Sequence, residues 1–411
     1  MLTHVGLKRL QARRAAGLSL SADEARLADL ARRGAADLEE RQAAALRERG
    51  WARVAPAALP MEEIRLLYRR NPLEHVSSVN FEITNRCNFA CRHCRNEGVE
   101  AATEPDVSRL VEAARLFLSL GIRRFDFIGG EVTRYGNGWL ELAQAISRMD
   151  RDEAWPQPLV VSVYTNGWWL GLGEFEAAGR THAGESEYLR ALARHGVTHV
   201  LFSIDGPEAL HDDWRGHPGL FRRILDGLPR VAAAGLAPRL SVVAREDEPL
   251  DHLRPLAQAI YGAGDGSLER LAEDPTNHFS SLVDVGRGAR LRRGSFALEG
   301  LDPGLLRCKA FFRPEPALHV RAGGEVGICP LMHGGEGYGS VHDRPLVDIL
   351  NGLHEAPLYR LHASGRIGRY LDRIPRETFG ERFDHLCAVR VAANRVALAE
   401  ARSRRASRRV R

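Results

Sequence analysis

The sequence predicts an α/β fold built on a parallel sheet, and three features support this prediction. From about residue 78 to residue 262, short apolar segments alternate with amphipathic segments of helical spacing. The apolar segments contain many Val, Ile and Phe residues, which favour strands. Three of them end in glycine-containing polar clusters, GGE, YTNG and SIDG. Strand then helix, repeated, indicates right-handed βα units and a parallel sheet, open or closed into a partial barrel.

Residues 1–75 are predicted to form an α-helical N-terminal extension, because they are rich in Ala, Leu, Arg and Glu and show no strand pattern. Ser21 followed by Glu24 is a capping-box signature, in which each side chain accepts a hydrogen bond from the backbone N–H of the other residue. A helix is therefore expected to begin just after Ser21. The composition of this extension indicates no particular function.

Residues 76–264 are predicted to form the core domain, with five recognisable strands. The strands are SVNFEIT (78–84), RRFDFIGG (123–130), PLVVSVYTNG (158–167), THVLFSIDG (198–206) and PRLSVVAR (238–245). Between the first two, a helix is expected whose apolar residues share one face: Leu110, Val111, Ala114, Phe117 and Leu118. Ligands of parallel sheets bind at the carboxyl ends of the strands, so the polar clusters there mark the expected site.

Residues 265–400 are predicted to form a smaller α+β region. The part from 265 to 307 shows no regular pattern, whereas CKAFFRPEPALHVRAGGEVGICP predicts a hairpin with its turn at Gly323 and Gly324. A helix is expected over HLCAVRVAANRVALAEARSRR. The basic tail, residues 401–411, is predicted to be disordered.

Composition and charge narrow the class of protein. The chain of 411 residues is 44% hydrophobic and 27% charged, has no run of apolar residues long enough to cross a bilayer, and starts without an export-signal pattern. We therefore expect a cytoplasmic protein with no membrane partner. The formal charge is +5, but the last ten residues carry six arginines, and without these six charges −1 remains. A solvated tail explains the charge without a nucleic-acid partner.

Three cysteines stand close together in CNFACRHC, at Cys87, Cys91 and Cys94, in a chain with only six. Three thiolates on one loop after a strand can each bind one iron of a [4Fe–4S] cluster and leave the fourth iron open. A zinc site in which His93 takes part is the alternative, although zinc sites usually show paired C-x2-C motifs.

This loop resembles the cluster-binding loop of the radical S-adenosylmethionine (radical SAM) superfamily, C-x3-C-x-aromatic-C, with His93 at the aromatic position. The resemblance covers roughly residues 78–262 and implies a partial (β/α)6 parallel barrel. It implies that S-adenosylmethionine (SAM) binds the open iron through its amine and carboxylate. The motif Gly129, Gly130 and Glu131 would then meet the methionyl amine of SAM, since a carboxylate accepts hydrogen bonds from an amino group.

The resemblance also implies further contacts with SAM. The residues concerned are Thr165, Asn166 and Gly167 at the ribose, Ser203 at the carboxylate and, as a weaker candidate, Arg215. Taken alone, TNG is more often a simple turn. A flavodoxin- or ferredoxin-type donor would reduce the cluster, and the reduced cluster would cleave SAM to a 5′-deoxyadenosyl radical that abstracts a substrate hydrogen atom.

The other cysteines are Cys308, Cys329 and Cys387. The spacing C-x15-G-x4-C from Cys308 to Cys329 resembles the opening of the SPASM/twitch extension, which implies one auxiliary iron–sulfur cluster. A non-cysteine group, with Asp302 and Glu299 as candidates, would complete the site, or one iron would stay open. Ordinary buried cysteines or a zinc site are the alternatives.

Six ligating cysteines would leave no thiol to return a hydrogen atom, which favours net oxidation over radical epimerisation. We expect oxidation of a small polar natural-product intermediate such as a sugar or aminocyclitol. Asp205 is a candidate base for a substrate hydroxyl, although a turn-capping role fits it too. The alternatives are maturation of a ribosomally made peptide and a non-catalytic iron–sulfur or zinc protein.

Overall fold

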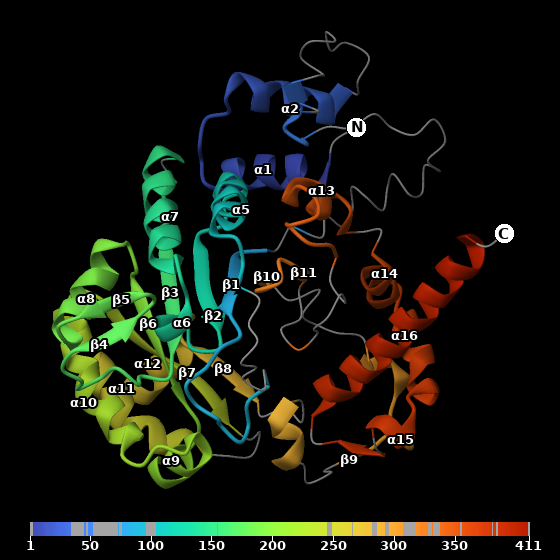
Figure 1. The fold of residues 1–411 in the computed structure, drawn as a ribbon. Coiled ribbons are helices and arrows are strands. Elements are labelled where there is room, and N and C mark those ends of the chain that lie inside the picture. Colours follow the sequence, from blue (N-terminus) through green and yellow to red (C-terminus); the bar gives the residue numbers. More distant parts are fainter. Residues whose placement is uncertain are drawn as a thin grey trace.

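The computed structural model describes residues 3–33, 45, 46, 48–51, 73, 76–95, 104–153, 155–244, 249–264, 266–281, 286–291, 296–306, 317–327, 331, 338–353, 356–379, 381–383 and 385–409. Its centre is an eight-stranded sheet with the order β11-β10-β1-β2-β3-β6-β7-β8 (Figure 1). The strands are β1 (Ser78–Thr84), β2 (Arg124–Gly129), β3 (Val160–Thr165), β6 (His199–Ile204), β7 (Ala237–Ala244), β8 (His278–Ser281), β10 (Ala317–Val320) and β11 (Val326–Gly327).

Every neighbouring pair in this sheet is parallel except β10 and β11, which are antiparallel. The six strands β1, β2, β3, β6, β7 and β8 follow chain order, so the predicted α/β fold with a partial (β/α)6 barrel is confirmed. All five strands expected between residues 78 and 245 are present. The carboxyl ends of these parallel strands lie at one edge of the sheet.

Helices cover the outer face of the sheet. They include α5 (Val107–Ser119), α7 (Trp139–Glu153), α8 (Glu185–Arg194), α10 (Leu220–Ala233), α11 (Arg254–Tyr261) and α12 (Ser267–Glu273). The rings of Phe117 in α5 and Phe81 in β1 lie 6.3 Å apart, and Phe81 also stacks on Phe125 of β2. Four of the five residues predicted on the inner face of α5 are buried, and Val111 is half-buried.

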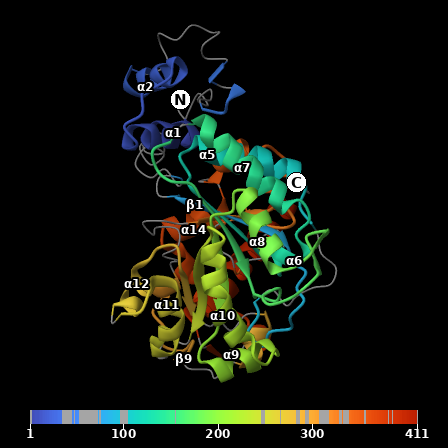
Figure 2. The same cartoon turned by 90° about the vertical axis from the view of Figure 1, so that its left-hand side faces the viewer.

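Three short elements lie at the carboxyl edge. They are α6 (Val132–Tyr135), the hairpin β4 (Phe175–Ala177) and β5 (Arg180–His182), and α9 (Glu208–Arg215). The helices α6 and α9 begin shortly after β2 and β6, whereas a longer segment that contains Asn166 and Gly167 leads from β3 to the hairpin. Figures 1 and 2 show α9 at the end of the molecule opposite the N-terminal helices.

The N-terminal extension contains α1 (His4–Ala15) and α2 (Ala22–Arg33). The predicted capping box is confirmed, because Ser21 N donates to Glu24 Oε2 at 2.7 Å and Glu24 N donates to Ser21 Oγ at 3.3 Å. Arg9 donates to the carbonyl of Ser119, at the last residue of α5. Because α5 runs back from the carboxyl edge, this contact places α1 at the far end of the sheet (Figures 1 and 2).

The C-terminal region differs from its prediction in two places. The stretch from 265 to 307 looks irregular in sequence, yet it contains α12 and the barrel strand β8, so the sheet continues past residue 264. The sequence of β8, HFSS, is too short to show the alternation of apolar and polar residues that is typical of a strand. Only its pairing with β7 identifies it as one. The basic tail expected to be disordered is helical to Arg409, because α16 (Leu386–Arg409) continues through Ala and Arg, which are strong helix formers.

The predicted hairpin is confirmed, since β10 and β11 pair antiparallel and Gly324 has the positive φ of 78° that its turn requires. A second apolar core forms around α16 and α14 (Pro357–Ala363), beside the barrel. Two further helices are α13 (Leu346–Asn351), which lies next to α1 and belongs to the first core, and α15 (Arg376–Phe379), near α16 (Figure 1). No helix in the described part of the chain has the length and apolar character needed to cross a membrane.

Candidate active site

The cysteine loop leaves β1 at the carboxyl edge of the sheet. Cys91 is buried, and Cys87 and Cys94 are half-buried against the same apolar core. Burial, with smaller contributions from the charges of Glu131, Cys91 and Cys94, raises the pKa of Cys87 to about 12. The three sulfur atoms are therefore close enough to interact electrostatically, as ligands of one group must be.

These residues fit an iron–sulfur cluster. Burial raises the pKa of Cys91, whereas the positive charges of Arg215 and Arg287 lower it. Two cations beside three thiols suit a group that binds thiolates and carries negative charge. Within the described ranges, no three Cys, His, Asp or Glu side chains are arranged to hold a single metal ion. An iron–sulfur cluster needs a different arrangement of ligands, because each thiolate binds a different iron atom of the cluster.

One side of the cysteine loop is held by the end of α9. Arg92 N donates to the carbonyl of Trp214 at 2.9 Å. The ring centroids of Phe89 and His217 lie 3.6 Å apart in a stacked arrangement. Between these two contacts α9 stops at Gly216, which takes the left-handed conformation (φ 68°) that ends many helices. Because α9 ends here, Trp214 and His217 can both contact the cysteine loop from the turn that follows the helix.

Arg287 holds the loop from the C-terminal part of the chain. Its Nε donates to the carbonyl of Cys91 at 2.8 Å, and its backbone N donates to the carbonyl of Cys94 at 2.9 Å. Arg287 lies in a short helical turn, Gly286–Leu291, 196 residues away from Cys91 in sequence. The sequence analysis missed it, because one arginine in an irregular segment carries no signal of such a distant contact.

The two glycines of the GGE motif let the backbone approach the cysteine loop. A Cβ on Gly130 would lie 2.0 Å from the carbonyl oxygen of Arg86, and one on Gly129 would lie 2.2 Å from that of Thr84. Gly130 N donates to the carbonyl of Thr84 at 2.6 Å, and Glu131 N donates to that of Arg86 at 2.8 Å. The two glycines thus let this backbone lie directly against the residues just before Cys87.

Glu131 lies buried among hydrogen-bond donors. It accepts from Asn166 N at 2.7 Å, from the Thr165 hydroxyl at 2.8 Å and from the Thr133 hydroxyl. Burial raises the pKa of Glu131, and these hydrogen bonds lower it in part. The structure therefore brings Glu131, Thr165 and Asn166 together as predicted. Their contacts with SAM stay a prediction.

Two side chains that the sequence analysis missed complete this network. Trp168, which directly follows the TNG motif, donates from its Nε1 to the Thr133 hydroxyl at 3.0 Å. This bond joins the motif to the residues around Glu131. Asn166 Nδ2 donates to Asn88 Oδ1 at 3.0 Å, which connects the network directly to the cysteine loop. In addition, Gly167 has the positive φ of 76° typical of a turn glycine.

Asp205 and Arg215 form a buried ion pair on the opposite side of the loop. Arg215 Nε and Nη2 donate to the two carboxylate oxygens at 2.5 and 3.1 Å. His93 Nε2 lies 3.3 Å from Asp205 Oδ1, so the loop itself joins the pair. Burial alone would raise the pKa of Asp205, but the charges of Arg215 and His93 hold it well below its usual range.

This geometry argues against the expected role of Asp205 as a base. Its carboxylate is fully buried, both oxygens are occupied by Arg215, and its lowered pKa makes it a weak proton acceptor. Asp205 instead positions Arg215 and His93. Ser203, two residues earlier in β6, is half-buried and pairs in register with Ser241 of β7.

Of the three cysteines outside the loop, the structure describes only Cys387. Cys308 and Cys329 lie outside the described residues. Cys387 is half-buried at the start of α16, where its N–H donates to His385 Nδ1 at 3.1 Å. Asp302 accepts from Gly304 N at 2.8 Å and so caps a short helical turn, and Glu299 is exposed.

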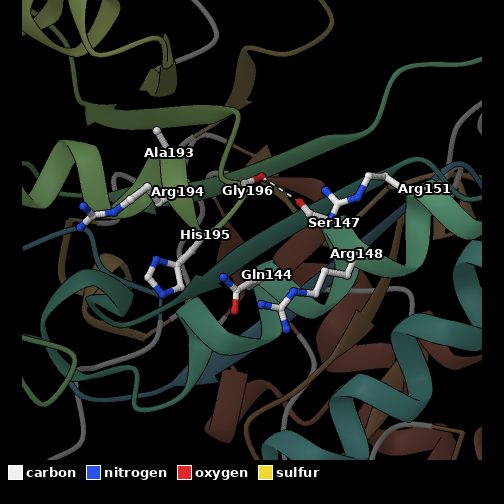
Figure 3. Close-up of a pocket in the computed structure, with 8 residues that line it drawn as sticks. All are labelled: Gln144, Ser147, Arg148, Arg151, Ala193, Arg194, His195 and Gly196. Atoms are coloured by element: carbon white, nitrogen blue, oxygen red, sulfur yellow. Dashed lines mark hydrogen bonds between the residues drawn. The ribbon is translucent and has the colours of Figure 1, made fainter.

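A separate pocket lies on the outer surface between α7 and the end of α8 (Figure 3). Its lining residues are Gln144, Ser147, Arg148, Arg151, Ala193, Arg194, His195 and Gly196. Several of these residues lie near the carboxyl ends of the two helices, where positive side chains interact favourably with the helix dipole. None of them takes part in the contacts described around the cysteine loop.

Comparisons with known proteins agree with this site. A GTP 3',8-cyclase of Caulobacter vibrioides is 27% identical over 224 residues, which is 52% of this chain and 58% of the relative. An AdoMet-dependent heme synthase of Oleidesulfovibrio alaskensis is 26% identical over 246 residues, 59% of this chain and 55% of the relative. The chain thus spans little more than half the length of these curated relatives.

Among solved structures, Streptococcus suis SuiB bound to S-adenosylmethionine superposes with a TM-score of 0.48 and 14% identity, covering 83% of this chain and 78% of that chain. The family model of the radical SAM superfamily matches residues 81–245. This segment contains the cysteine loop, the GGE motif, TNG and the Asp205–Arg215 pair. Over residues 81–245, the chain therefore matches the radical SAM superfamily.

Proposed function

We propose that this protein is an oxidoreductase that oxidises a small polar natural-product intermediate, such as a sugar or aminocyclitol, by radical SAM chemistry. The match of residues 81–245 to the superfamily implies a [4Fe–4S] cluster that binds SAM. When bound and reduced, this cofactor pair supplies a 5′-deoxyadenosyl radical that removes a hydrogen atom from the substrate. The observation that carries the proposal is the cysteine loop, held at the carboxyl edge of the barrel between two buried networks.

Each residue around the loop has a part in this proposal. Cys87, Cys91 and Cys94 would hold the cluster, and the Glu131 network would fix the turn at Asn166 beside SAM. Arg215 carries a positive charge next to the thiols, and Asp205 keeps it in place. The apolar core around the loop limits the access of water, which a reactive radical requires.

The placement of Cys387 supports one auxiliary cluster. Cys387 packs against an apolar core that contains Leu306 and Leu331. Cys308 is two residues from Leu306, and Cys329 is two residues from Leu331. The proposal of one auxiliary cluster rests on these three cysteines together with the spacing C-x15-G-x4-C from Cys308 to Cys329. An auxiliary cluster there would accept the second electron of a net oxidation.

A small-molecule substrate is favoured over a peptide by two observations. The described N-terminal helices lie at the end of the sheet away from the cysteine loop, where they would not meet a substrate entering at the carboxyl edge. The two relatives are also named for work on small molecules, GTP and heme. Peptide maturation remains the second candidate function, and a flavodoxin- or ferredoxin-type protein is the proposed electron donor.

Anaerobic reconstitution followed by reduction with dithionite tests the proposal. The wild type should bind about eight irons and convert SAM to 5′-deoxyadenosine and methionine. Cys308→Ala/Cys329→Ala should bind about four irons and still cleave SAM. Four irons in both proteins would remove the auxiliary site and restore the epimerase alternative. Absence of SAM cleavage in an iron-loaded wild type would contradict the proposed function and support a non-catalytic iron–sulfur protein.

A further inference from the structure

His211 in α9 binds the main chain of Asp205. Its side chain is completely buried, and its Nδ1 accepts a hydrogen bond from the backbone N–H of Asp205 at 3.2 Å. Asp205 is the first residue after β6, whose pairing with β7 ends at Ile204 and Val242. An imidazole nitrogen thus takes the place of a strand partner at the point where the sheet ends.

The same helix binds the carboxylate of Asp205. Arg215 comes four residues after His211 and donates to the two carboxylate oxygens at 2.5 and 3.1 Å. Residues four apart in a helix lie on the same face. One face of α9 therefore holds Asp205 at two points, at its backbone through His211 and at its side chain through Arg215.

The helix α9 is also fixed to its surroundings. The carboxylate of Asp212 accepts from Gly219 N at 2.6 Å and from Phe221 N at 2.9 Å. The carbonyl of Trp214 accepts from Arg92 N in the cysteine loop at 2.9 Å. Because these bonds hold the helix in place, loss of the contact between His211 and the end of β6 would displace Asp205 relative to Arg215.

The hydrogen bond with Asp205 defines the protonation of His211. A ring nitrogen that accepts a hydrogen bond carries no proton, so the neutral ring has its proton on Nε2. Burial, with a smaller contribution from the charge of Arg215, lowers the pKa of His211 to about 4, although the carboxylates of Asp205 and Asp212 raise it. His211 is therefore neutral at neutral pH and keeps Nδ1 as an acceptor.

The other ring nitrogen of His211 shows that packing does not explain a histidine here. Within the described part of the chain, the buried Nε2 makes no hydrogen bond. The ring meets that of Phe221 edge-on, with the centroids 5.8 Å apart. A buried N–H without an acceptor is costly, and an apolar side chain of similar size would avoid this cost. The contact of Nδ1 with Asp205 is therefore what the histidine provides.

We propose that His211 is a positioning residue for SAM binding, which fixes the backbone of Asp205 and thereby holds the guanidinium group of Arg215 beside the cysteine loop. The loop is joined to the same carboxylate, because His93 Nε2 lies 3.3 Å from Asp205 Oδ1. A shift of Asp205 therefore moves Arg215 and the loop relative to each other. The inference deepens the proposed function and rests on it, since SAM would bind at this loop.

SAM binding to the reconstituted protein tests the inference. The dissociation constant is measured from the change of the [4Fe–4S] electron paramagnetic resonance signal during titration with SAM, so it refers only to molecules that carry the cluster. His211→Leu should raise this constant about tenfold, because Arg215 is displaced. His211→Asn should stay within about threefold of the wild type, since the amide oxygen can accept from Asp205 N in place of Nδ1. A wild-type dissociation constant in His211→Leu would overturn the inference.

Urea unfolding of the cluster-free variants separates positioning from folding. Leucine fills most of the space of the imidazole without a buried polar atom, whereas asparagine leaves a cavity. The unfolding midpoint of His211→Leu should therefore lie at or above that of His211→Asn, while the affinity for SAM follows the reverse order. If the affinity instead follows the order of the midpoints, His211 has a structural role and the inference is wrong.

His195→Leu is the matched control. His195 also contacts a backbone group through Nδ1, the carbonyl of Ala191 at 2.7 Å, but it lies at the outer end of α8, away from the cysteine loop. Its dissociation constant for SAM should equal that of the wild type. A tenfold increase in this variant as well would show that the loss is not specific to His211 and would overturn the inference.

A variant without the ion pair tests whether His211 acts through Arg215. In Asp205→Asn/Arg215→Met there is no guanidinium group to position, so adding His211→Leu should change the dissociation constant for SAM by less than about twofold. A further loss as large as in the wild-type background would mean that His211 acts independently of Arg215, which contradicts the inference.

Formation of 5′-deoxyadenosine, measured on the same samples, separates two kinds of failure. A wild type that cleaves SAM but binds it as tightly as His211→Leu does contradicts only the role of His211. A wild type whose SAM binding depends on His211 but which never forms 5′-deoxyadenosine contradicts the proposed function instead.

Discussion

Glu131 and Asp205 are both buried at the carboxyl edge of the sheet, on opposite sides of the cysteine loop, but their partners differ. Glu131 accepts hydrogen bonds from neutral groups, the hydroxyls of Thr133 and Thr165 and the N–H of Asn166. Asp205 is paired with the guanidinium group of Arg215. As a result, the pKa of Glu131 is raised by burial, and that of Asp205 is lowered despite it.

The difference shows how one site can hold two carboxylates for different purposes. Neutral donors fix the position of Glu131 without compensating its charge, so a positive group such as an amine can still gain from its presence. The charge of Asp205 is already compensated, which leaves it to hold Arg215 and His93 against the loop. These partners agree with the roles that we propose, recognition of an amine by Glu131 and positioning of Arg215 and His93 by Asp205.

The largest effect is expected from Arg215→Met, which leaves Asp205 buried without its cation. The free energy of unfolding should fall by about 3–5 kcal/mol, the range seen when one partner of a buried ion pair is removed. Urea unfolding of the cluster-free protein measures this. In the double variant Asp205→Asn/Arg215→Met much of the loss should be recovered. A loss below about 1 kcal/mol in the single variant would show that the pair is weakly coupled.

A smaller loss is expected from Glu131→Gln. Glutamine keeps the shape of the side chain but turns an NH2 group toward the same donors in place of one acceptor oxygen, so one hydrogen bond is lost. The free energy of unfolding should fall by about 1–3 kcal/mol. Thr133→Val, which removes one donor, is the matched variant for the same network. A fall equal to that of Arg215→Met would contradict the distinction between the two sides.

The two carboxylates should also respond to pH in opposite directions. Asp205 has a lowered folded pKa, so its stabilisation is present above its ordinary pKa of 3.8 and is lost as the pH falls toward the folded pKa. Glu131 has a raised pKa, so its contribution is largest below 4.5 and is lost as the pH rises through the folded pKa.

Unfolding of the wild type, Asp205→Asn and Glu131→Gln between pH 3 and pH 8 checks this prediction. The advantage of the wild type over Asp205→Asn should shrink toward low pH, and its advantage over Glu131→Gln should shrink toward high pH. Where the pKa of a carboxyl in the folded protein differs by one from its value in the unfolded chain, stability changes by about 1.4 kcal/mol. Parallel pH profiles of the two variants would contradict the prediction.

The smallest effect is expected from His93→Phe. Phenylalanine keeps the contact between the ring of residue 93 and Trp214, whose centroids lie 5.3 Å apart, and loses only the contact with Asp205. The free energy of unfolding should change by about 1 kcal/mol. Asp213→Asn, which breaks an exposed ion pair with Arg92, should cost even less and is the control. A loss of several kcal/mol in His93→Phe would make His93 a principal partner of Asp205.

The barrel strands and the capping box were predictable because their signals are local. Alternation in SVNFEIT and the pair Ser21–Glu24 depend on neighbours in sequence. The short strand β8 was missed, since four residues without alternation become a strand only through pairing with β7. The helical end of α16 was also missed, because the arginine-rich segment was interpreted from its charge as a disordered tail although arginine has a high helix propensity.

The candidate site was predictable to a similar extent. The motifs placed Glu131, Thr165 and Asn166 at neighbouring strand ends, and the structure brings them together. The contact of Arg287 with Cys91 was not accessible, because 196 residues separate the two and no motif connects them. Likewise, the sequence does not show that Arg215, ten residues after Asp205, points back to it and occupies both of its carboxylate oxygens.

The central claim is that the loop of Cys87, Cys91 and Cys94 holds a cluster that cleaves SAM. Electron paramagnetic resonance of the reduced, reconstituted protein before and after addition of SAM tests it most directly. The wild type should show a [4Fe–4S] signal that changes with SAM and should form 5′-deoxyadenosine, and Cys91→Ala should lose both while keeping any auxiliary signal. A SAM-sensitive signal of wild-type size in Cys91→Ala would contradict the claim.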